Sequence, residues 1–276
     1  MPIIDYTKDM YLLTDIGGTK TLLAIANQSG KVLHSFKFPT ISDQKLFSKN
    51  LIQQIRSNFA LSGITAIGVA MPGIVKRNLA IEMGNLPWKN FDLAKLLKDK
   101  FGVNAYIEND ANLAALAEAQ KQTGRSIYLT FSTGIGGGVV DDGKLSPSYK
   151  NFEPGHKIYQ LNGETAEWED LASAKAFHDK YNKNVQDVLE DNFWDKEIPE
   201  AISLGLIPIV QKLKPDRIIF GGPIGFELNR YRAPLRKILK DALPKATLPR
   251  LFVAKYGSFS VIQGCYLYAK AKSSHK

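Results

Sequence analysis

The chain has a single cysteine, Cys265, among its 276 residues. One thiol cannot form an intramolecular disulfide, and it cannot supply the several cysteines of a multi-cysteine zinc site. A lone cysteine fits a protein that works under reducing conditions, so a cytoplasmic location is expected.

Long apolar runs are absent as well. No stretch of about 18 or more apolar residues occurs, so no membrane-spanning helix is expected. Residues 1–9 lack the basic start and apolar core of a secretory signal peptide, and none is expected. With 44% hydrophobic and 23% charged residues, the composition is that of a globular protein long enough for two lobes.

Acidic residues are outnumbered, which gives a formal net charge of +9. The basic residues are spread along the chain, and no basic run interleaved with aromatics and no zinc-finger spacing appears. Anionic substrates such as nucleotides or polyphosphate are one explanation of the charge. A generally basic surface is the other.

A glycine-containing turn lies near the start of the chain. Apolar residues 11–13 and 22–26 flank the segment Asp15-Ile16-Gly17-Gly18-Thr19-Lys20. The pattern predicts strand, tight turn and strand, with the paired glycines supplying positive φ values. A carboxylate, a hydroxyl, an ammonium and free backbone N–H groups suit a phosphate chain with its Mg²⁺. An ordinary hairpin with a solvated lysine is the alternative.

A second turn repeats this design. The segment Thr133-Gly134-Ile135-Gly136-Gly137-Gly138 joins an expected strand, residues 126–131, to a second expected strand that leaves through Val139-Val140-Asp141. A strand follows the glycines, so the segment is not a dinucleotide-binding fingerprint, which needs a helix there. Two such hairpins predict an internally duplicated architecture.

Hydrophobic periodicity and turn residues predict the remaining elements. Strands are expected at residues 32–38, 64–70, 104–108, 216–220 and 251–254. Helices are expected at residues 47–59, 91–101, 111–120, 165–191, 198–213 and 262–272, and a further helix is expected after Pro223, through Leu235 and Leu239.

Four signals in order carry a family resemblance: the two glycine turns, Glu108-Asn109-Asp110-Ala111-Asn112, and Phe220-Gly221-Gly222-Pro223. From about Tyr11 to Lys270 the chain resembles the ROK family of bacterial sugar kinases and repressors. Met71-Pro72-Gly73 and Asn85-Leu86-Pro87-Trp88 resemble further family segments.

The resemblance implies an α/β, two-lobed fold of the actin/hexokinase/Hsp70 ATPase type, built from duplicated ribonuclease H-like domains. We expect a small lobe of residues 1–112 plus 262–276 and a large lobe of residues 113–261, with a cleft that closes on sugar.

The resemblance also implies a nucleotide site. Asp15 would hold Mg²⁺ through water, beside the turn glycines Gly17 and Gly18. The other residues implied in ATP or phosphate binding are Thr19, Lys20, Thr133, Gly134, Gly221 and Gly222. For the last two, a plain strand-to-helix turn is an equal alternative.

Asp110 is the catalytic residue that the resemblance implies. It would accept the proton of a sugar hydroxyl as that oxygen attacks the γ-phosphoryl group. Because it begins an apolar helix, the helix dipole should keep its carboxylate ionised. A simple helix cap is the alternative.

The sugar site implied by the resemblance combines residues from both lobes. Glu153-Pro154-Gly155-His156 resembles the family's Glu-x-Gly-His segment, whose carboxylate and imidazole can hold neighbouring hydroxyls. Glu169 would be the third sugar contact, although Glu167 competes with it. The implied set is Gly73, Asn109, Asp110, Glu153, His156 and Glu169.

The chain departs from the family at the zinc loop. Gln160, Asn162 and Glu167 stand where most members have cysteines, although Gly163 is retained. These side chains are poor substitutes for thiolates at structural zinc, so no zinc is expected. The zinc-less form resembles the polyphosphate glucokinase and simple glucokinase branches. Before the second turn, Phe131-Ser132 replaces the usual small residue and glycine.

Taken together, these features predict a hexose kinase that converts glucose to glucose 6-phosphate with ATP and Mg²⁺. Polyphosphate as donor, and another hexose or an N-acetylhexosamine as acceptor, stay open. A catalytically silent sugar- or nucleotide-binding regulator and a conformational ATPase are rivals of other classes. Only fourteen residues precede Asp15, too few for the repressors' DNA-binding domain, so no nucleic-acid partner is expected. A homodimer is implied by resemblance.

Overall fold

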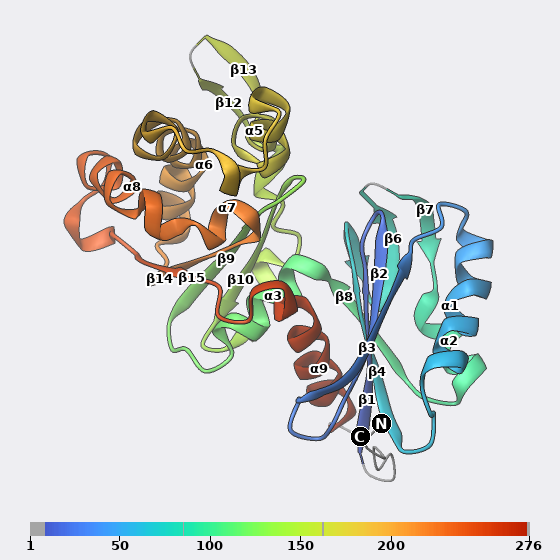
Figure 1. Cartoon of the computed structure of the whole chain (residues 1–276). Helices are drawn as coiled ribbons and strands as arrows, with labels where there is room; N and C mark the ends of the chain where they lie inside the picture. The colour runs from blue at the N-terminus through green and yellow to red at the C-terminus, as the bar shows by residue number, and fades with distance from the viewer. Residues whose placement is uncertain (1–8, 85, 162, 275–276) are drawn as a thin grey trace. The chain divides into compact units, whose positions relative to one another are not determined.

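The structure is a computed structural model that describes residues 9–84, 86–161 and 163–274. The chain forms two compact units, residues 1–117 with 261–276 and residues 118–260 (Figure 1). In the part of the chain that is described, no helix is long and apolar enough to cross a membrane.

Unit 1, residues 1–117 with 261–276, contains a mixed five-stranded sheet. Its strands are β1 (Met10–Ile16), β2 (Lys20–Ala26), β3 (Val32–Pro39), β4 (Ile64–Met71) and β8 (Ala105–Asn109). The order is β3-β2-β1-β4-β8. β1, β2 and β3 are antiparallel neighbours, as predicted, while β4 runs parallel to both β1 and β8.

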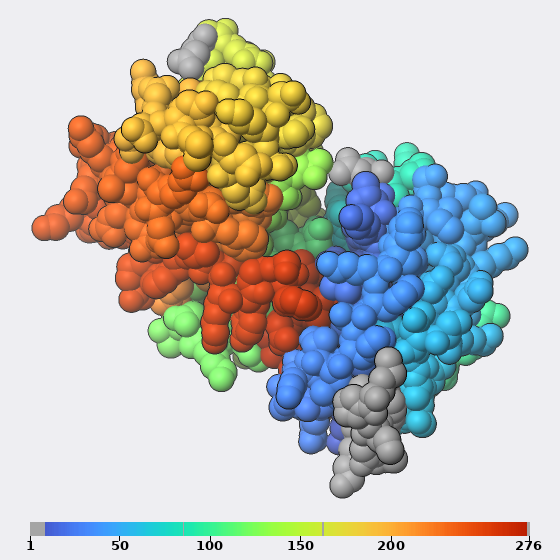
Figure 2. All heavy atoms as spheres, in the orientation of Figure 1, coloured from blue at the N-terminus to red at the C-terminus, as the bar shows by residue number. Residues whose placement is uncertain are grey.

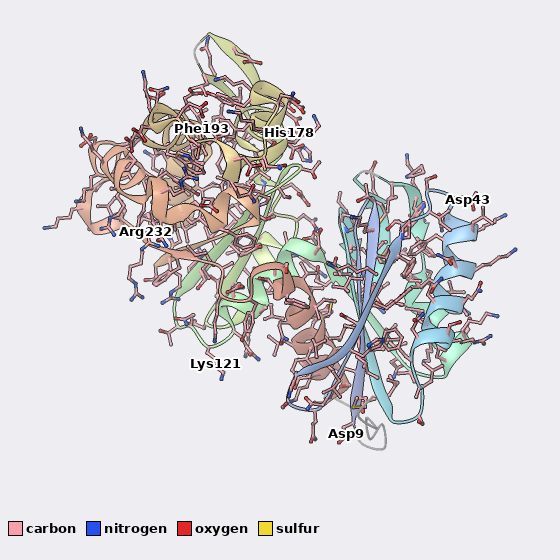
Figure 3. All side chains as sticks on the ribbon, viewed as in Figure 1. Asp9, Asp43, Lys121, His178, Phe193 and Arg232 are labelled. Atoms are coloured by element: carbon pink, nitrogen blue, oxygen red, sulfur yellow. The ribbon has the colours of Figure 1, made fainter. Side chains whose placement is uncertain are left out.

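Alternating residues of β1 build two cores, one on each face of this sheet. Leu12 packs with residues of α1 (Gln44–Asn58) and α2 (Leu93–Phe101). Leu13 packs on the other face with residues of α9 (Ser260–Ser273) and with Leu113 of α3 (Asp110–Ala119). Asp43 caps the start of α1, because its carboxylate accepts the backbone N–H of Leu46 at 2.8 Å. Figure 3 labels Asp43 at this end of the helix.

A second sheet in unit 1 consists of β5 (Ile74–Lys76), β6 (Leu79–Met83) and β7 (Leu86–Phe91), in that order and antiparallel. Its Trp88 is buried against Phe47 of α1. In the space-filling view, the blue side chains of α1 form part of the outer surface of unit 1 (Figure 2). The family segment that includes Asn85 falls partly outside the described residues, because Asn85 is not among them.

Unit 2, residues 118–260, repeats the topology of the first sheet. Its strands are β9 (Arg125–Phe131), β10 (Ile135–Asp141), β11 (Lys144–Leu145), β14 (Arg217–Gly221) and β15 (Arg250–Val253). They lie in the order β11-β10-β9-β14-β15 and have the same sequence of antiparallel and parallel neighbours as β3-β2-β1-β4-β8. The predicted duplication is confirmed.

Helices cover one face of the second sheet, and its core is a single cluster. Ile127, Leu129 and Phe131 of β9 pack there against α6 (Ile198–Leu213) and α8 (Leu228–Ala242). Phe193 begins a π-helical turn, Phe193–Glu197, and lies inside this cluster (Figure 3). The shorter helices of the unit are α4 (Trp168–Ala172), α5 (Ala174–Tyr181) and α7 (Gly222–Phe226).

One predicted helix is wrong both at its start and after Tyr181. Residues 165–191 were expected to be helical, but Thr165 to Glu167 belong to β13 (Glu164–Glu167), which pairs with β12 (Ile158–Leu161). Helix begins only at Trp168, and residues after Tyr181 form turns and a 3₁₀ segment, Val185–Asp187. The sequence pair Asn162-Gly163 is a hairpin-turn signal, and Gly163 has a φ of +87°. The segments on either side of it lack the apolar alternation that indicates strands, so local pattern missed the hairpin.

Candidate functional site

The first glycine turn does not use the backbone conformation expected for it. Gly17 and Gly18 both have negative φ, so the expectation of positive φ is wrong. Three residues separate β1 from β2, and the backbone N–H of Gly17 donates to the carbonyl oxygen of Lys20 at 3.0 Å. A two-residue hairpin would need positive φ, whereas this longer turn does not. Thr19 and Lys20 are exposed at its tip.

Asp15 lies near the end of β1 and is partly buried. Burial is the main cause that raises the pKa of Asp15 to about 7; the neighbouring Asp110 contributes to this rise, and Lys37 opposes it. Strand register explains the lysine, because Asp15 pairs with Leu22 and Leu22 pairs with Lys37. Residues directly across a sheet share a face. Lys37 is therefore a candidate site residue that sequence motifs alone did not reveal.

Asp110 is the first residue of α3, directly after β8. One carboxylate oxygen accepts the N–H of Ala111 at 2.7 Å. Nevertheless, desolvation dominates and raises the pKa of Asp110 to about 6. We expected the helix dipole to favour the anion; burial outweighs that contribution here. The carboxylate remains mostly ionised at pH 7.

Asn109 connects this helix start to Gly73. Its amide nitrogen donates to the carbonyl oxygen of Gly73 at 3.0 Å, and its amide oxygen accepts the N–H of Asn112 at 3.0 Å. Gly73 has a φ of +84°, and a Cβ at this position would collide with the backbone of Glu82. Two residues of the predicted sugar set are thus joined directly, and Asn109 retains a second amide hydrogen for a ligand.

In unit 2, the second glycine turn contacts a residue of the predicted sugar set. The N–H of Ile135 donates to a carboxylate oxygen of Glu169 at 3.1 Å. A Cβ on Gly134 would lie 2.5 Å from this same oxygen, and a Cβ on Gly155 would lie 2.6 Å from it. Glu169 therefore occupies a narrow space between the turn and the Glu153–His156 segment. The N–H of Ile135 is therefore paired within unit 2.

Buried Trp168 anchors the two competing carboxylates. Its indole N–H donates to the carbonyl oxygen of Ala201 at 2.9 Å, and its ring packs edge-on against Phe131. Glu167 ends β13 on one side of it, and Glu169 lies in the first turn of α4 on the other. The backbone N–H of Trp168 also donates to Lys157 at 2.7 Å, so both glutamates are held close to the His156 segment.

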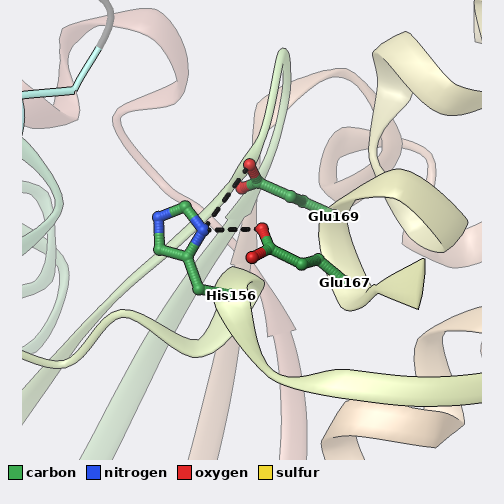
Figure 4. A group of neighbouring side chains, drawn as sticks. All are labelled: His156, Glu167 and Glu169. Atoms are coloured by element: carbon green, nitrogen blue, oxygen red, sulfur yellow. Dashed lines mark hydrogen bonds and ion pairs between the residues drawn. The ribbon is translucent and has the colours of Figure 1, made fainter.

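His156 ends a short 3₁₀ turn, Pro154–His156, and faces both glutamates (Figure 4). Its Nδ1 lies 2.9 Å from a carboxylate oxygen of Glu167 and 3.9 Å from one of Glu169. The hydrogen bond with Glu167 is the main cause that raises the pKa of His156, and Glu169 and Glu153 add to it. Each of the three residues offers one oxygen or nitrogen atom that could bind a metal ion, and these atoms lie within 4.8 Å of one another. The structure thus brings together His156, Glu167 and Glu169, while Glu153 acts on the imidazole through its charge.

Gly221 and Gly222 lie at the end of β14 and the start of α7. A Cβ on Gly221 would collide with the Tyr128 side chain, and one on Gly222 would lie 2.5 Å from the Phe131 carbonyl oxygen. Gly222 also has a φ of +74°. Internal packing is thus sufficient to explain both glycines. A role beside adenosine stays a prediction.

The positions matched to the zinc loop have separate surroundings. Gln160 is exposed on β12, Glu167 pairs with His156, and Asn162 lies outside the described residues. The absence of zinc stays a prediction.

Residues 11–272 match the model of the ROK family. The chain belongs to the ROK family. A fructokinase of Zymomonas mobilis is 30% identical over 248 residues, which are 79% of this chain and 80% of that protein. A glucokinase of Halalkalibacterium halodurans is 26% identical over 87% of each chain.

A ROK family glucokinase from Streptomyces griseus, solved in complex with glucose and AMPPNP, superposes with a TM-score of 0.78. It is 21% identical and covers 95% of this chain and 99% of its own. The ROK chain therefore has the two-lobed α/β fold of the sugar kinases, which belongs to the actin/hexokinase-like ATPases. Its relatives include hexose kinases, and xylose repressors also match it.

Proposed function

We propose that this ROK protein is an ATP-dependent hexose kinase that transfers the γ-phosphoryl group to the 6-hydroxyl of glucose. The observation that supports this most is the pair Asp15 and Asp110 in unit 1, two partly buried carboxylates of which Asp110 lies close enough to help raise the pKa of Asp15. A glucokinase and a fructokinase among the relatives support a hexose as the acceptor.

Asp110 is the base in this proposal. One of its oxygens accepts the N–H of Ala111 at the start of the helix, and the carboxylate would accept the proton of a sugar hydroxyl. With a pKa near 6, it is mostly ionised at pH 7 and still basic enough to receive a proton late in phosphoryl transfer. Asn109 and Gly73 would hold the hydroxyls beside it.

Asp15 would hold Mg²⁺ through water. The fit is chemical: carboxylate and water oxygens are the ligands that Mg²⁺ prefers. Burial, and then the neighbouring Asp110, raise the pKa of Asp15, and a bound cation would favour the ionised carboxylate against both effects. Bound Mg²⁺ would neutralise charge on the transferred phosphate. Lys37, Thr19 and Lys20 would interact with the donor's phosphate oxygens from the protein side.

The residues of unit 2 would bind sugar and donor through separate groups. His156, Glu153 and Glu169 offer donors and acceptors for neighbouring hydroxyls. Thr133 and Gly134 lie on the turn beside Glu169 and are proposed to contact the nucleotide, as are Gly221 and Gly222.

The test is a coupled assay of ADP release with ATP and Mg²⁺ against glucose, fructose, mannose and two N-acetylhexosamines. We expect glucose to give the highest kcat/KM. Replacing Asp110 by Asn or Ala should lower kcat by roughly 10²–10⁴-fold, while nucleotide binding measured by calorimetry stays near normal. The control is Asp99→Asn, which changes an exposed surface aspartate of the same unit. Near-normal kcat in the Asp110 variants would refute the base assignment.

Polyphosphate is the second candidate donor, and one observation in unit 1 favours testing it. A groove of about 900 Å³ is lined by the basic side chains of Lys76, Arg77, Lys95 and Lys98, with Asp92 as a carboxylate beside them. Such a groove suits a flexible polyanion. Turnover with polyphosphate in place of ATP, and its loss on Arg77→Ala and Lys98→Ala together, would support this donor.

A silent regulator is the rival from another class. It would bind hexose or nucleotide without releasing ADP. Sugar-dependent ADP release separates the two, and a conformational ATPase would release ADP without any sugar.

A further inference from the structure

The imidazole of His156 has one nitrogen engaged and one directed elsewhere. Nδ1 lies 2.9 Å from Glu167. In Figure 4 both glutamates lie on the Nδ1 side of the ring, and Nε2 points away from them. A histidine held through Nδ1 by a carboxylate has a defined tautomer and ring orientation, which leaves Nε2 to meet a ligand.

We propose that Glu167 is a positioning residue, which holds the His156 ring so that Nε2 meets a sugar hydroxyl, while Glu169 contacts the sugar itself. This inference rests on the proposed hexose kinase function. It divides the roles of two glutamates that sequence comparison left in competition.

The two carboxylates differ in their contacts. Glu167 is directed at Nδ1 and receives no backbone N–H bond in α4. Glu169 is 3.9 Å from Nδ1, but its other oxygen accepts the N–H of Ile135 at 3.1 Å. Because Glu169 is tied to the glycine turn, it is a weak restraint on the ring, whereas Glu167 makes the direct bond.

The fold holds Glu167 in this place. Ile158 pairs with Glu167 across the β12–β13 hairpin. Because Ile158 follows His156 by two residues, this register places Glu167 beside the His156 segment. The buried neighbour Trp168 fixes the end of that strand, with its backbone N–H bonded to Lys157. The contact is thus set by backbone pairing and by a core side chain.

The charged groups acting on the ring are Glu167, Glu169 and Glu153, with Lys157 next to it in the chain. All three carboxylates favour the imidazolium, and the bond to Glu167 is the largest effect. Removing the charge of Glu167 should therefore lower the pKa of His156 while the other two carboxylates stay in place.

The experiment compares Glu167→Gln and Glu167→Ala in the full chain. Glutamine keeps an acceptor for Nδ1–H without the charge, and alanine removes both. We expect KM for glucose to rise roughly threefold in the glutamine variant and about tenfold in the alanine variant, as for loss of a hydrogen bond, with kcat changed less. The matched control is Glu164→Gln, an exposed glutamate on the same strand.

NMR titration of the histidine rings gives a second readout that does not depend on turnover. The signal of His156 is assigned through its loss in His156→Gln. Its pKa should fall in both Glu167 variants and stay unchanged in Glu164→Gln. The pH at which KM changes should move in the same direction as that pKa.

Three results would overturn the proposal. An unchanged His156 pKa with a raised KM would make Glu167 a direct sugar contact. Unchanged pKa and KM in Glu167→Ala would give it no role. If a chelator selective for Zn²⁺ over Mg²⁺ raised the wild-type KM and added Zn²⁺ restored it, the three side chains would form a metal site instead. If no hexose is phosphorylated, the proposed function fails, but the titration still reports on the Glu167–His156 pair.

Discussion

At the scale of single residues, burial decides the charge state of the two central carboxylates. Asp110 begins a helix, a position that ordinarily lowers a carboxyl pKa. Its pKa is nevertheless raised to about 6, because desolvation outweighs the backbone hydrogen bonds. The pKa of Asp15 is raised to about 7, because desolvation together with the charge of Asp110 outweighs the attraction of Lys37. Burial that shifts a carboxyl pKa in this way costs stability, and groups with such shifted pKa values are typical of functional sites.

Asp110→Asn is expected to stabilise the protein. The folded-state pKa near 6 lies above the ordinary value of 3.8 for an aspartate, so the wild type loses stability as pH rises from about 4 to 6 and the full loss is present at pH 7. Asparagine removes this cost and keeps the acceptor for Ala111. Discounted for the partial exposure of the group, the gain is about 1–3 kcal/mol, or a few degrees in Tm.

Calorimetry or thermal denaturation followed by circular dichroism measures this gain. It should be smaller at pH 5 than at pH 7, and Asp99→Asn should not reproduce it. Equal Tm values for wild type and Asp110→Asn at pH 7 would mean that Asp110 is solvated in the folded protein.

The pH dependence of catalysis follows from the same residue. Asp110 must be ionised to accept a proton, so kcat/KM for the hexose should fall below about pH 6, close to tenfold per pH unit. Steady-state rates between pH 5 and 8 at constant ionic strength measure this fall in kcat/KM. A fall that is centred near pH 4, the ordinary range of a carboxyl pKa, would argue against burial of the base.

At the scale of elements, the glycine-rich segments serve packing as much as ligand binding. Gly17 and Gly18 turn without positive φ, whereas Gly222 needs it and also lies against the carbonyl of Phe131. A motif glycine therefore has to be judged from its own neighbours. Gly222, at the junction of β14 and α7, is the glycine at which a substitution tests this packing role most directly.

Gly222→Ala is expected to destabilise unit 2 by roughly 2–4 kcal/mol, because it adds both a strained φ and a contact with backbone. Gly257→Ala is the matched control: Gly257 has a φ of +54°, but no atom lies within 4 Å of its Cβ position. It should cost only about 1 kcal/mol. Urea unfolding midpoints measure the difference, and similar shifts in the two variants would show that the contact with Phe131 relaxes.

At the scale of the whole molecule, the excess of positive charge has no single location in the sequence. A net charge of +9 creates a field that attracts anions over about a Debye length. A neutral sugar does not feel this field, whereas a nucleotide or polyphosphate does.

The KM for the phosphoryl donor is therefore expected to rise several-fold between about 0.05 and 0.3 M NaCl, because salt shortens the screening length from roughly 14 to 6 Å. The KM for glucose, measured at a saturating donor concentration, should change little and provides the internal control. A donor KM independent of salt would limit its binding to short-range contacts.

Much of the fold could be predicted from local pattern. The three antiparallel strands at the start, helix α6 and the duplicated hairpins have strong periodicity and turn residues of their own. The β12–β13 hairpin and strand β5 were not predicted, because these strands have three or four residues and are only partly buried. Polar residues such as Thr165 and Glu167 show no apolar alternation that would distinguish strand from helix.

For the site, the sequence by itself determined the order of motifs and hence the family, since Asp15, Asp110, Glu153 and His156 occur in recognisable local contexts. Only the tertiary structure decided which of them touch. Lys37 acts on Asp15 through a register three strands wide, and Glu167 reaches His156 through a hairpin. The tertiary structure also decided the charge state of Asp110, because the desolvation that raises its pKa comes from surrounding residues that no local motif contains.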